Sequence, residues 1–256
     1  MEDPEILYRQ YAKKIYNLAF RMTGNSDDAK DITQETFVQV FKSIDQFRGQ
    51  SQIYTWLYQI AKNNCIRFLA KKSKTTFISL QGLIDKVSSP VSEEISEAEK
   101  SIYITQIKDG CLSGLLRCLS LQQRLAFILT VLLDLPVEQV ADIIEKSENA
   151  TRILVHRSKQ NIREFLCRNC SLYDSKNSCQ CENLLNFSLK QGWIGLNSAA
   201  FSSTGRIESE IKNLKDVVRL YKTLHEHIPS VNFNEQIKQM LADKENILIF
   251  SDKKVK

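Results

Sequence analysis

Two consecutive stretches decide the fold: residues 26–45 read SDDAKDITQETFVQVFKSID, and residues 47–72 read FRGQSQIYTWLYQIAKNNCIRFLAKK. In both stretches, apolar residues recur at intervals that place them on one face of an α-helix. Ser26 is a suitable N-cap for the first helix, and acids follow it where the helix dipole favours them. The two stretches therefore predict one helix over 26–45 and another from Ile53 to about Ala70.

The first of these helices is acidic and the second is basic. Five acids stand against two lysines between Ser26 and Asp45, whereas five basic residues and no acid lie between Lys62 and Lys74. Aromatic residues lie near the basic run. Basic side chains neutralise phosphates and aromatic surfaces hold unstacked bases, so the combination favours binding of single-stranded DNA. A solvated basic face beside a buried tryptophan is the alternative interpretation.

The composition indicates an all-α protein. The chain has 256 residues, of which 43% are hydrophobic, with 8 Gly and 4 Pro, too few turn residues for a many-stranded sheet. Its net charge of +5 alone does not identify a nucleic-acid binder. We find no apolar run of the roughly 18 residues that a membrane span requires and no secretory signal at the start, so a cytoplasmic protein is expected. Motifs such as the P-loop, H-E-x-x-H and G-x-S-x-G are also missing, which predicts a protein that is not an enzyme.

A second helical unit follows a polar, acidic segment. Residues 106–166 carry apolar residues at helical spacing, and Pro136 stands at the first turn of a short helix. Ser147 is the expected N-cap of the next helix, which runs to Leu166 and carries an excess of basic residues. This pattern predicts a helix-turn-helix.

Three motifs in the first unit and two in the second resemble one known family. They are Asp31-Ile32-Thr33-Gln34-Glu35-Thr36-Phe37, Phe47-Arg48-Gly49, Thr55-Trp56-Leu57-Tyr58-Gln59-Ile60-Ala61, Leu119-Ser120-Leu121-Gln122-Gln123-Arg124, and the stretch from Val140-Ala141 through His156-Arg157. The first three resemble the sigma-two domain of extracytoplasmic-function (ECF) sigma factors of bacterial RNA polymerase, and the last two resemble the sigma-four domain. The resemblance covers roughly residues 6–166.

The resemblance implies partners and site residues. Core RNA polymerase and promoter DNA are the expected partners, and an anti-sigma factor is a further candidate. The implied polymerase contacts are Asp31, Gln34, Glu35 and Phe37, with core packing as the alternative for Phe37. The implied contacts with the promoter −10 element are Phe47, Arg48, Gly49, Ser51, Asn63, Arg67 and Lys71, of which the loop residues form a pocket for a flipped base. The implied contacts with the −35 element are Arg152, His156, Arg157 and Lys159.

Four cysteines follow the helix-turn-helix closely. Cys167, Cys170, Cys179 and Cys181 lie within fifteen positions. A C-x-x-C pair beside a second close pair supplies the four soft ligands that zinc prefers, so a structural zinc site is predicted. Free or redox-switching thiols and ordinary packing are the alternatives.

The expected organisation is therefore two helical domains with a small extension. The predicted boundaries are 1–75 for the sigma-two-like domain, 76–105 for a linker, 106–166 for the sigma-four-like domain, 167–194 for the cysteine-rich segment and 195–256 for a helical extension. The extension is expected to contain a helix from about Arg206 to Ile228, whose heptad-like seam packs on its own domain or binds a partner, and a shorter helix after Pro229. His225 and His227 are weaker metal candidates.

The predicted function is that of an ECF-like sigma factor, regulated through its cysteine-rich tail. A helix-turn-helix regulator that acts without core polymerase is the competing hypothesis. It has no use for the basic helix of the first unit. A metal or redox sensor is a third hypothesis, and it is compatible with the first.

Overall fold

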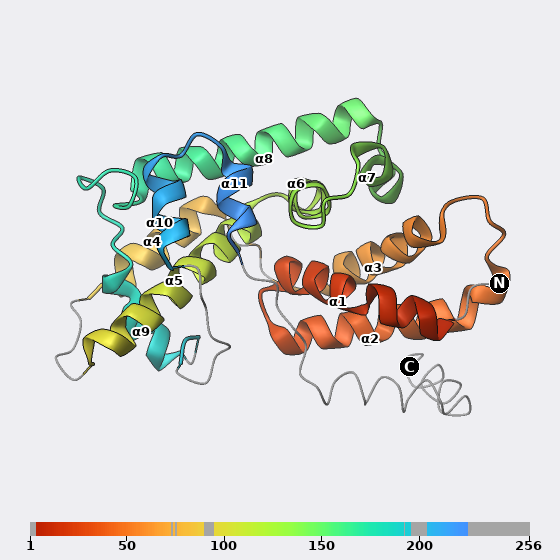
Figure 1. Ribbon diagram of the computed structural model, residues 1–256, viewed down its shortest axis with the longest axis horizontal. Coiled ribbons are helices and arrows are strands. Elements are labelled where there is room, and N and C mark those ends of the chain that lie inside the picture. The colour runs from red at the N-terminus through yellow and green to blue at the C-terminus, as the bar shows by residue number, and fades with distance from the viewer. Residues whose placement is uncertain are drawn as a thin grey trace. The chain divides into compact units, whose positions relative to one another are not determined.

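Figure 1 shows the computed structural model, which describes residues 4–72, 74, 76–89, 95–191, 193–195 and 204–224. Every regular element within these ranges is helical, as predicted, and the backbone there forms a single isolated β-bridge. None of the helices described is long and apolar enough to cross a membrane. The chain divides into two compact units. Within the described residues, unit 1 comprises residues 4–72 and 141–146, and unit 2 comprises the rest up to residue 224.

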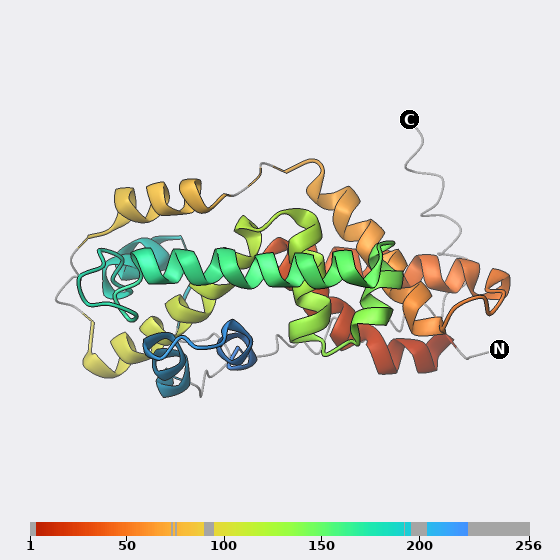
Figure 2. The same ribbon diagram turned by 90° about the horizontal axis from the view of Figure 1, so that it is seen from above.

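Unit 1 is built on three helices that lie side by side (Figures 1 and 2). They are α1 (Pro4–Thr23), α2 (Ser26–Ser43) and α3 (Ile53–Leu69), and a short 3₁₀ turn, η1 (Ile44–Gln46), follows α2. The helical spacing of apolar residues on α1 places Leu7, Ile15 and Leu18 in the core with no exposed surface. The two helices predicted over 26–45 and from Ile53 to about Ala70 form as α2 and α3, within about two residues of the expected ends.

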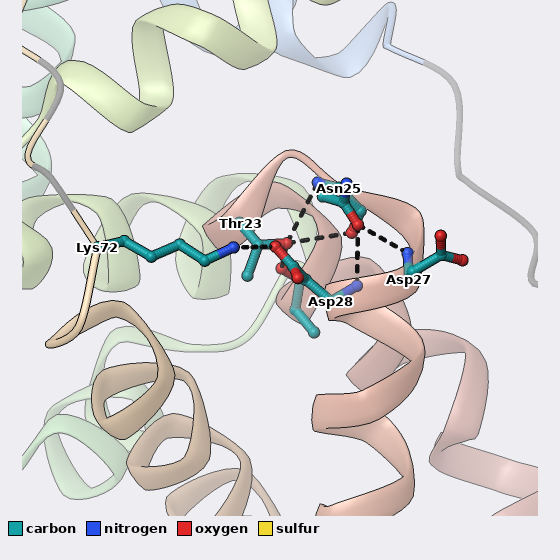
Figure 3. A network of polar contacts seen from close by, with 6 residues as sticks. Thr23, Asn25, Asp27, Asp28 and Lys72 are labelled. Atoms are coloured by element: carbon teal, nitrogen blue, oxygen red, sulfur yellow. Dashed lines mark hydrogen bonds and ion pairs between the residues drawn. The ribbon is translucent and has the colours of Figure 1, made fainter.

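The N-cap of α2 is Asn25 rather than the predicted Ser26. Gly24 adopts a positive φ of 73°, which ends α1 and places Asn25 in the extended conformation of an N-cap. The Asn25 Oδ1 atom accepts hydrogen bonds from the backbone N–H groups of Asp27 and Asp28, each at 2.9 Å (Figure 3). Ser26 is thus the first residue within the helix.

Unit 2 contains α8 (Glu148–Asn169), the second helix of the predicted helix-turn-helix, and the start of α7 (Val137–Ile144), the first. The helices before them are α4 (Phe77–Val87), α5 (Glu97–Cys118), α6 (Leu121–Phe127) and a π-helical turn η2 (Ile128–Leu132). The Ser147 hydroxyl accepts a hydrogen bond from the backbone N–H of Ala150 at 3.2 Å, which confirms the predicted cap. Helix α8 runs three residues beyond Leu166 and is the longest helix of unit 2 together with α5.

The segment predicted as a linker is partly helical. Helix α4 and the first two turns of α5 lie within residues 76–105. Thr76 and Ser96 each form a capping box at the start of these helices. A capping box provides acceptors for backbone N–H groups of the first helical turn, which in an unstructured linker would bind water. The Phe77 ring lies 5.6 Å from the Phe165 ring, so α4 packs on α8.

The predicted continuous helix of the extension is broken in two. The structure has α10 (Thr204–Lys212) and α11 (Val217–Lys222). The break has a local cause. The Asp216 Oδ1 atom accepts a hydrogen bond from the backbone N–H of Val218 at 2.8 Å. Asp216 is therefore the N-cap of a new helix, at a position where the heptad-like pattern predicts an uninterrupted one. His225, His227 and Ile228 lie outside the described residues.

Helices α10 and α11 belong to the core of unit 2 (blue in Figures 1 and 2). The Tyr221 ring is fully buried and meets the Phe127 ring edge to face at 4.9 Å. Its hydroxyl donates a hydrogen bond to the Leu112 carbonyl at 2.8 Å. Ile207, Ile211 and Leu214 are buried as well. The seam thus packs on its own domain, which was the first of the two alternatives.

Replacing Tyr221 tests this packing. Tyr221→Ala should lower the free energy of unfolding by about 3–5 kcal/mol, because it removes a fully buried aromatic ring. Tyr221→Phe should cost about 1 kcal/mol, because only the hydroxyl contact is lost. Lys212→Ala, at an exposed position, is the matched control. Denaturant unfolding measures all three. A Tyr221→Ala variant as stable as the parent would show that α11 does not pack as described.

Candidate functional site

The acidic surface of unit 1 consists of Asp31, Gln34 and Glu35 on α2. Asp31 is exposed, and the other two side chains are half-buried. The Glu35 Oε1 atom accepts a hydrogen bond from Gln39 Nε2 at 2.8 Å, which orients the carboxylate along the helix. These three predicted residues share one side of α2 and are accessible together.

Phe37 does not share this accessibility. Its side chain has no exposed surface, and its ring meets the Tyr8 ring edge to face at 5.0 Å. The same burial raises the pKa of the Tyr8 hydroxyl to about 12. A side chain enclosed in this way cannot contact a partner without unfolding α2. The structure therefore favours core packing, the alternative that the sequence left open for Phe37.

A buried hydrogen bond joins the acidic helix to the basic helix. Asn64 Nδ2 on α3 donates to the Thr36 hydroxyl oxygen on α2 at 3.1 Å, and the Thr36 hydroxyl donates to the Ile32 carbonyl at 2.7 Å. Leu57 and Ala61 on the same side of α3 are completely buried. The apolar contact and the directional bond together fix the rotation of α3 relative to α2.

A second link lies at the ends of the same two helices. Lys72 Nζ forms an ion pair with the Asp28 carboxylate, next to the Asn25 cap (Figure 3). Lys72 Nζ also lies 4.5 Å from the centre of the Phe68 ring. An exposed ion pair contributes no more than about 1 kcal/mol. The sequence places Lys72 in the basic run and does not indicate that it pairs with α2, because the partner lies more than forty residues earlier.

The loop after η1 forms an open pocket. Its lining includes Phe47, Gly49, Gln50, Ser51 and Tyr54. Arg48, Gly49 and Ser51 are exposed, as a contact loop requires. The half-buried Phe47 ring lies 5.3 Å from the Trp56 ring, so an aromatic pair stands beside the pocket. Gly49 has a positive φ of 68°, which a side chain would strain.

Exposed polar residues also lie on α3, the helix that follows this loop, and just beyond its end. Asn63 and Arg67 are one helical turn apart on the same face of α3, and Lys71 lies in the turn that follows the end of the helix at Leu69; all three are exposed. Asn64, the neighbour of Asn63, points into the core instead. We call Asn63, Arg67 and Lys71 the basic row. The predicted DNA contacts of unit 1 are therefore accessible, and the acidic surface lies on a different helix of the same unit.

The basic residues of α8 are accessible as well. His156 and Arg157 are exposed, and Lys159 is half-buried. Arg152 is exposed but donates to the Glu148 carboxylate at 2.8 Å, a pair that DNA must compete with. The opposite face of α8 is buried through Thr151, Val155, Ser158 and Ile162.

The four clustered cysteines do not all lie together. Cys170 and Cys179 are buried, and their backbones pair in the β-bridge. Burial raises the pKa of Cys179 to about 11 and that of Cys181 to about 12. Cys167 contacts the Tyr173 hydroxyl instead, and this hydrogen bond raises the pKa of Tyr173. Among the described residues, no three Cys, His, Asp or Glu side chains stand close enough to hold a metal ion. The zinc site on Cys167, Cys170, Cys179 and Cys181 stays a prediction.

Comparisons with known proteins agree with the two-unit arrangement. Residues 7–75 match the family Sigma-70 region 2, and residues 109–162 match Sigma-70, region 4. The RNA polymerase sigma factor YlaC of Bacillus subtilis is 30% identical over 171 residues, which are 64% of this chain and 92% of YlaC. The ECF RNA polymerase sigma factor SigE of Mycolicibacterium smegmatis is 28% identical over 165 residues, 64% of this chain and 62% of SigE.

A solved structure is also similar. The sigma factor RpoE of Bartonella quintana, in complex with the anti-sigma factor NepR, aligns with a TM-score of 0.45 and 18% identity over 63% of this chain and 95% of that chain. The sequence matches, in the order region 2 then region 4, disfavour a regulator that acts without polymerase. With an acidic and a basic helix in unit 1 and a helix-turn-helix after it, the chain belongs to the ECF family of RNA polymerase sigma factors, which direct promoter recognition and transcription initiation.

Proposed function

We propose that unit 1 binds core polymerase through the acidic surface and opens the promoter −10 element with the basic row and the loop at residues 47–52. The observation that carries the proposal is the fixed relation of the two helices. The Asn64–Thr36 hydrogen bond joins α2 to α3, while Asp31 on one helix and Arg67 on the other are both exposed. One rigid body can therefore bind a protein with one surface and DNA with another.

Opening of the −10 element uses the loop and the basic row together. Unpairing a base costs a few kcal/mol, which stacking and phosphate contacts must repay. The pocket beside Phe47 offers loop backbone and an aromatic edge to a flipped base, and Gly49 leaves room for close approach. Arg67 and Lys71 neutralise phosphates of the separated strand, and the Asn63 amide can both donate and accept hydrogen bonds at a base edge.

Recognition of the −35 element belongs to α8 in this proposal. The first turns of a recognition helix enter the major groove, and base edges are read there by polar side chains. Arg152, His156 and Arg157 are exposed on those turns, and Lys159 lies next to them. Ile153 is 43% exposed on the same helix and offers only apolar contact, such as with a thymine methyl group.

Regulation through the cysteine-rich segment is the second part of the proposal. Cys170 is the C-cap of α8, and its backbone N–H bonds to the Leu166 carbonyl at 3.0 Å. A change in the state of this thiol therefore acts directly on the end of the recognition helix. An anti-sigma factor is a further proposed partner, on the basis of family membership alone.

Charge reversal tests the polymerase contact. Asp31→Lys combined with Glu35→Lys should reduce co-purification with core polymerase at least tenfold, because both acids are replaced by like charges facing an electropositive partner surface. Glu5→Lys combined with Asp45→Lys changes the net charge equally in the same unit, at exposed positions, and should leave co-purification unchanged. Equal co-purification of both double variants would refute the assignment of the acidic surface. Circular dichroism confirms that each variant is folded.

Loss of the basic row tests the melting role. Asn63→Ala combined with Arg67→Ala should reduce permanganate reactivity of unpaired thymines in the −10 region about tenfold, because each lost base or phosphate contact costs about 1 kcal/mol or more. Binding to core polymerase should stay within twofold of the parent. Lys42→Ala, an exposed basic position on α2, is the control. A footprint as strong as that of the parent would remove Asn63 and Arg67 from the DNA surface.

A further inference from the structure

The segment that follows α8 is fixed at both of its ends. It leads from the end of α8 to two short helices, η3 (Glu182–Leu184) and α9 (Leu185–Lys190). Leu185 packs in a core cluster with Tyr103 and Ile107 of α5. The residues between α8 and η3 are therefore held between two packed elements and are not a free tail.

Within this segment, the backbone pairs with itself at Cys170 and Cys179. The Cys179 N–H donates to the Asn169 carbonyl at 3.0 Å, and the Ser171 N–H donates to the Cys179 carbonyl at 3.1 Å. These two bonds form the parallel β-bridge. Backbones paired in this way lie about 4.8 Å apart. Disulfide bonds join residues whose Cα atoms are about 4.4–6.8 Å apart, so the backbone already has the spacing that a disulfide requires.

The turn between the two cysteines stabilises this pairing. Asn177 Nδ2 donates to the carbonyls of Cys167 and Cys170, each at 3.0 Å. The Asp174 N–H also donates to the Cys170 carbonyl, at 3.2 Å. The turn thus supplies donors to carbonyl groups at the end of α8, which have no partner within the helix. A bond between the two sulfur atoms therefore requires no rearrangement of the backbone.

The environment of the two thiols agrees with their pairing. Cys170 is 8% exposed and Cys179 is 7% exposed. Burial raises the pKa of Cys179 to about 11, and the neighbouring Cys170 contributes to this rise. Burial also raises the pKa of Cys170, but hydrogen bonds from the backbone of Leu172 and Tyr173 act in the opposite direction. Cys170 is therefore the thiol of the pair that ionises more readily.

We infer that Cys170 and Cys179 form a reversible disulfide bond, and that the oxidant is a low-molecular-weight disulfide, the oxidised form of a small thiol. The Cys170 thiolate attacks one sulfur of the small disulfide, which gives a mixed disulfide and releases one small thiolate. Cys179 then attacks the Cys170 sulfur, forms the intramolecular bond and releases the second small thiolate. The two protein thiols lose two electrons to the small disulfide, and their two protons pass to the two small thiolates.

The disulfide would convert the turn after α8 into a covalent ring. Cys170 is the C-cap of α8, so this ring is attached directly to the end of the helix. Oxidation would also remove two of the four thiols from the predicted zinc site, so the disulfide and the bound metal exclude each other. The effect on promoter recognition rests on the proposed function, whereas formation of the disulfide does not.

A redox titration of the full chain with peptide mapping tests the pairing. The chain is equilibrated with mixtures of reduced and oxidised glutathione in the presence of a metal chelator, the remaining thiols are alkylated, and the chain is cut with trypsin. Cleavage after arginine and lysine gives separate peptides for residues 164–168, 169–176 and 177–190, which contain Cys167, Cys170, and Cys179 with Cys181, respectively. Mass spectrometry then identifies which peptides are joined.

The joined peptides 169–176 and 177–190 should be at least tenfold more abundant than any other cross-linked product of the parent chain. Cys167→Ser and Cys181→Ser should keep this cross-link, because neither residue belongs to the bridge. Cys179→Ser should reduce it at least tenfold, since only Cys181 then remains on the second peptide.

Three results would overturn the inference: no cross-link at any glutathione ratio, glutathione attached to Cys170 without the cross-link, or a cross-link that persists in Cys179→Ser and disappears in Cys181→Ser. If Cys179→Ser does not fold, by circular dichroism, Cys181→Ser decides. An undiminished cross-link supports the inference, and a diminished one overturns it. The charge-reversal experiment on Asp31 and Glu35 involves no thiol, so failure of one proposal is distinguishable from failure of the other.

Discussion

The packing of α2 on α3, closed by the buried hydrogen bond from Asn64 to Thr36, is the constraint on which the function of unit 1 depends. Loss of the Thr36 hydroxyl leaves the buried Asn64 amide without this acceptor, at a cost of about 1–3 kcal/mol, whereas the Thr36 hydroxyl also donates to the Ile32 carbonyl. The bond also decides which asparagine faces outward, because Asn63 and Asn64 are adjacent and only one of them can enter the interface. The acidic surface and the basic row are consequently presented by one rigid element.

The core of unit 2 also depends on contacts between residues that are distant in sequence. The residues after α8 complete the core that carries the recognition helix, since Tyr221 packs on Phe127 and Lys108 pairs with Glu208 of α10. The buried Lys108 ammonium requires such a partner, because an unpaired charge at this position is strongly unfavourable. The cysteine-rich segment lies within this body, because Leu185 packs against Tyr103 and Ile107 of α5.

Much of the fold could be predicted from the sequence because apolar periodicity is a local signal. The helices of unit 1 and the capped α8 follow from it. The predicted helix boundaries are wrong where local backbone geometry or a hydrogen-bonding side chain determines where a helix begins. Gly24 shifts the cap of α2 to Asn25, and Asp216 starts a new helix within an unbroken heptad pattern.

The candidate site was predictable to a smaller extent. The motif identifies Asp31, Gln34, Glu35 and Phe37 together, yet only the structure shows that Phe37 is enclosed by Tyr8. Cys167 was predicted as a metal ligand from its C-x-x-C spacing to Cys170. That spacing does not indicate which way the side chain points, and in the structure Cys167 contacts the Tyr173 hydroxyl.

Transcription in vitro is the most direct test of the central claim that this chain directs core polymerase to promoters. Core polymerase is incubated with a genomic promoter library, with and without the purified chain, and the transcripts are mapped. If the chain directs core polymerase, transcripts should start from a set of sites that share −35 and −10 elements, and only when the chain is added. Transcription no different from that of core polymerase alone, together with specific binding of the isolated chain to duplex DNA, would contradict it.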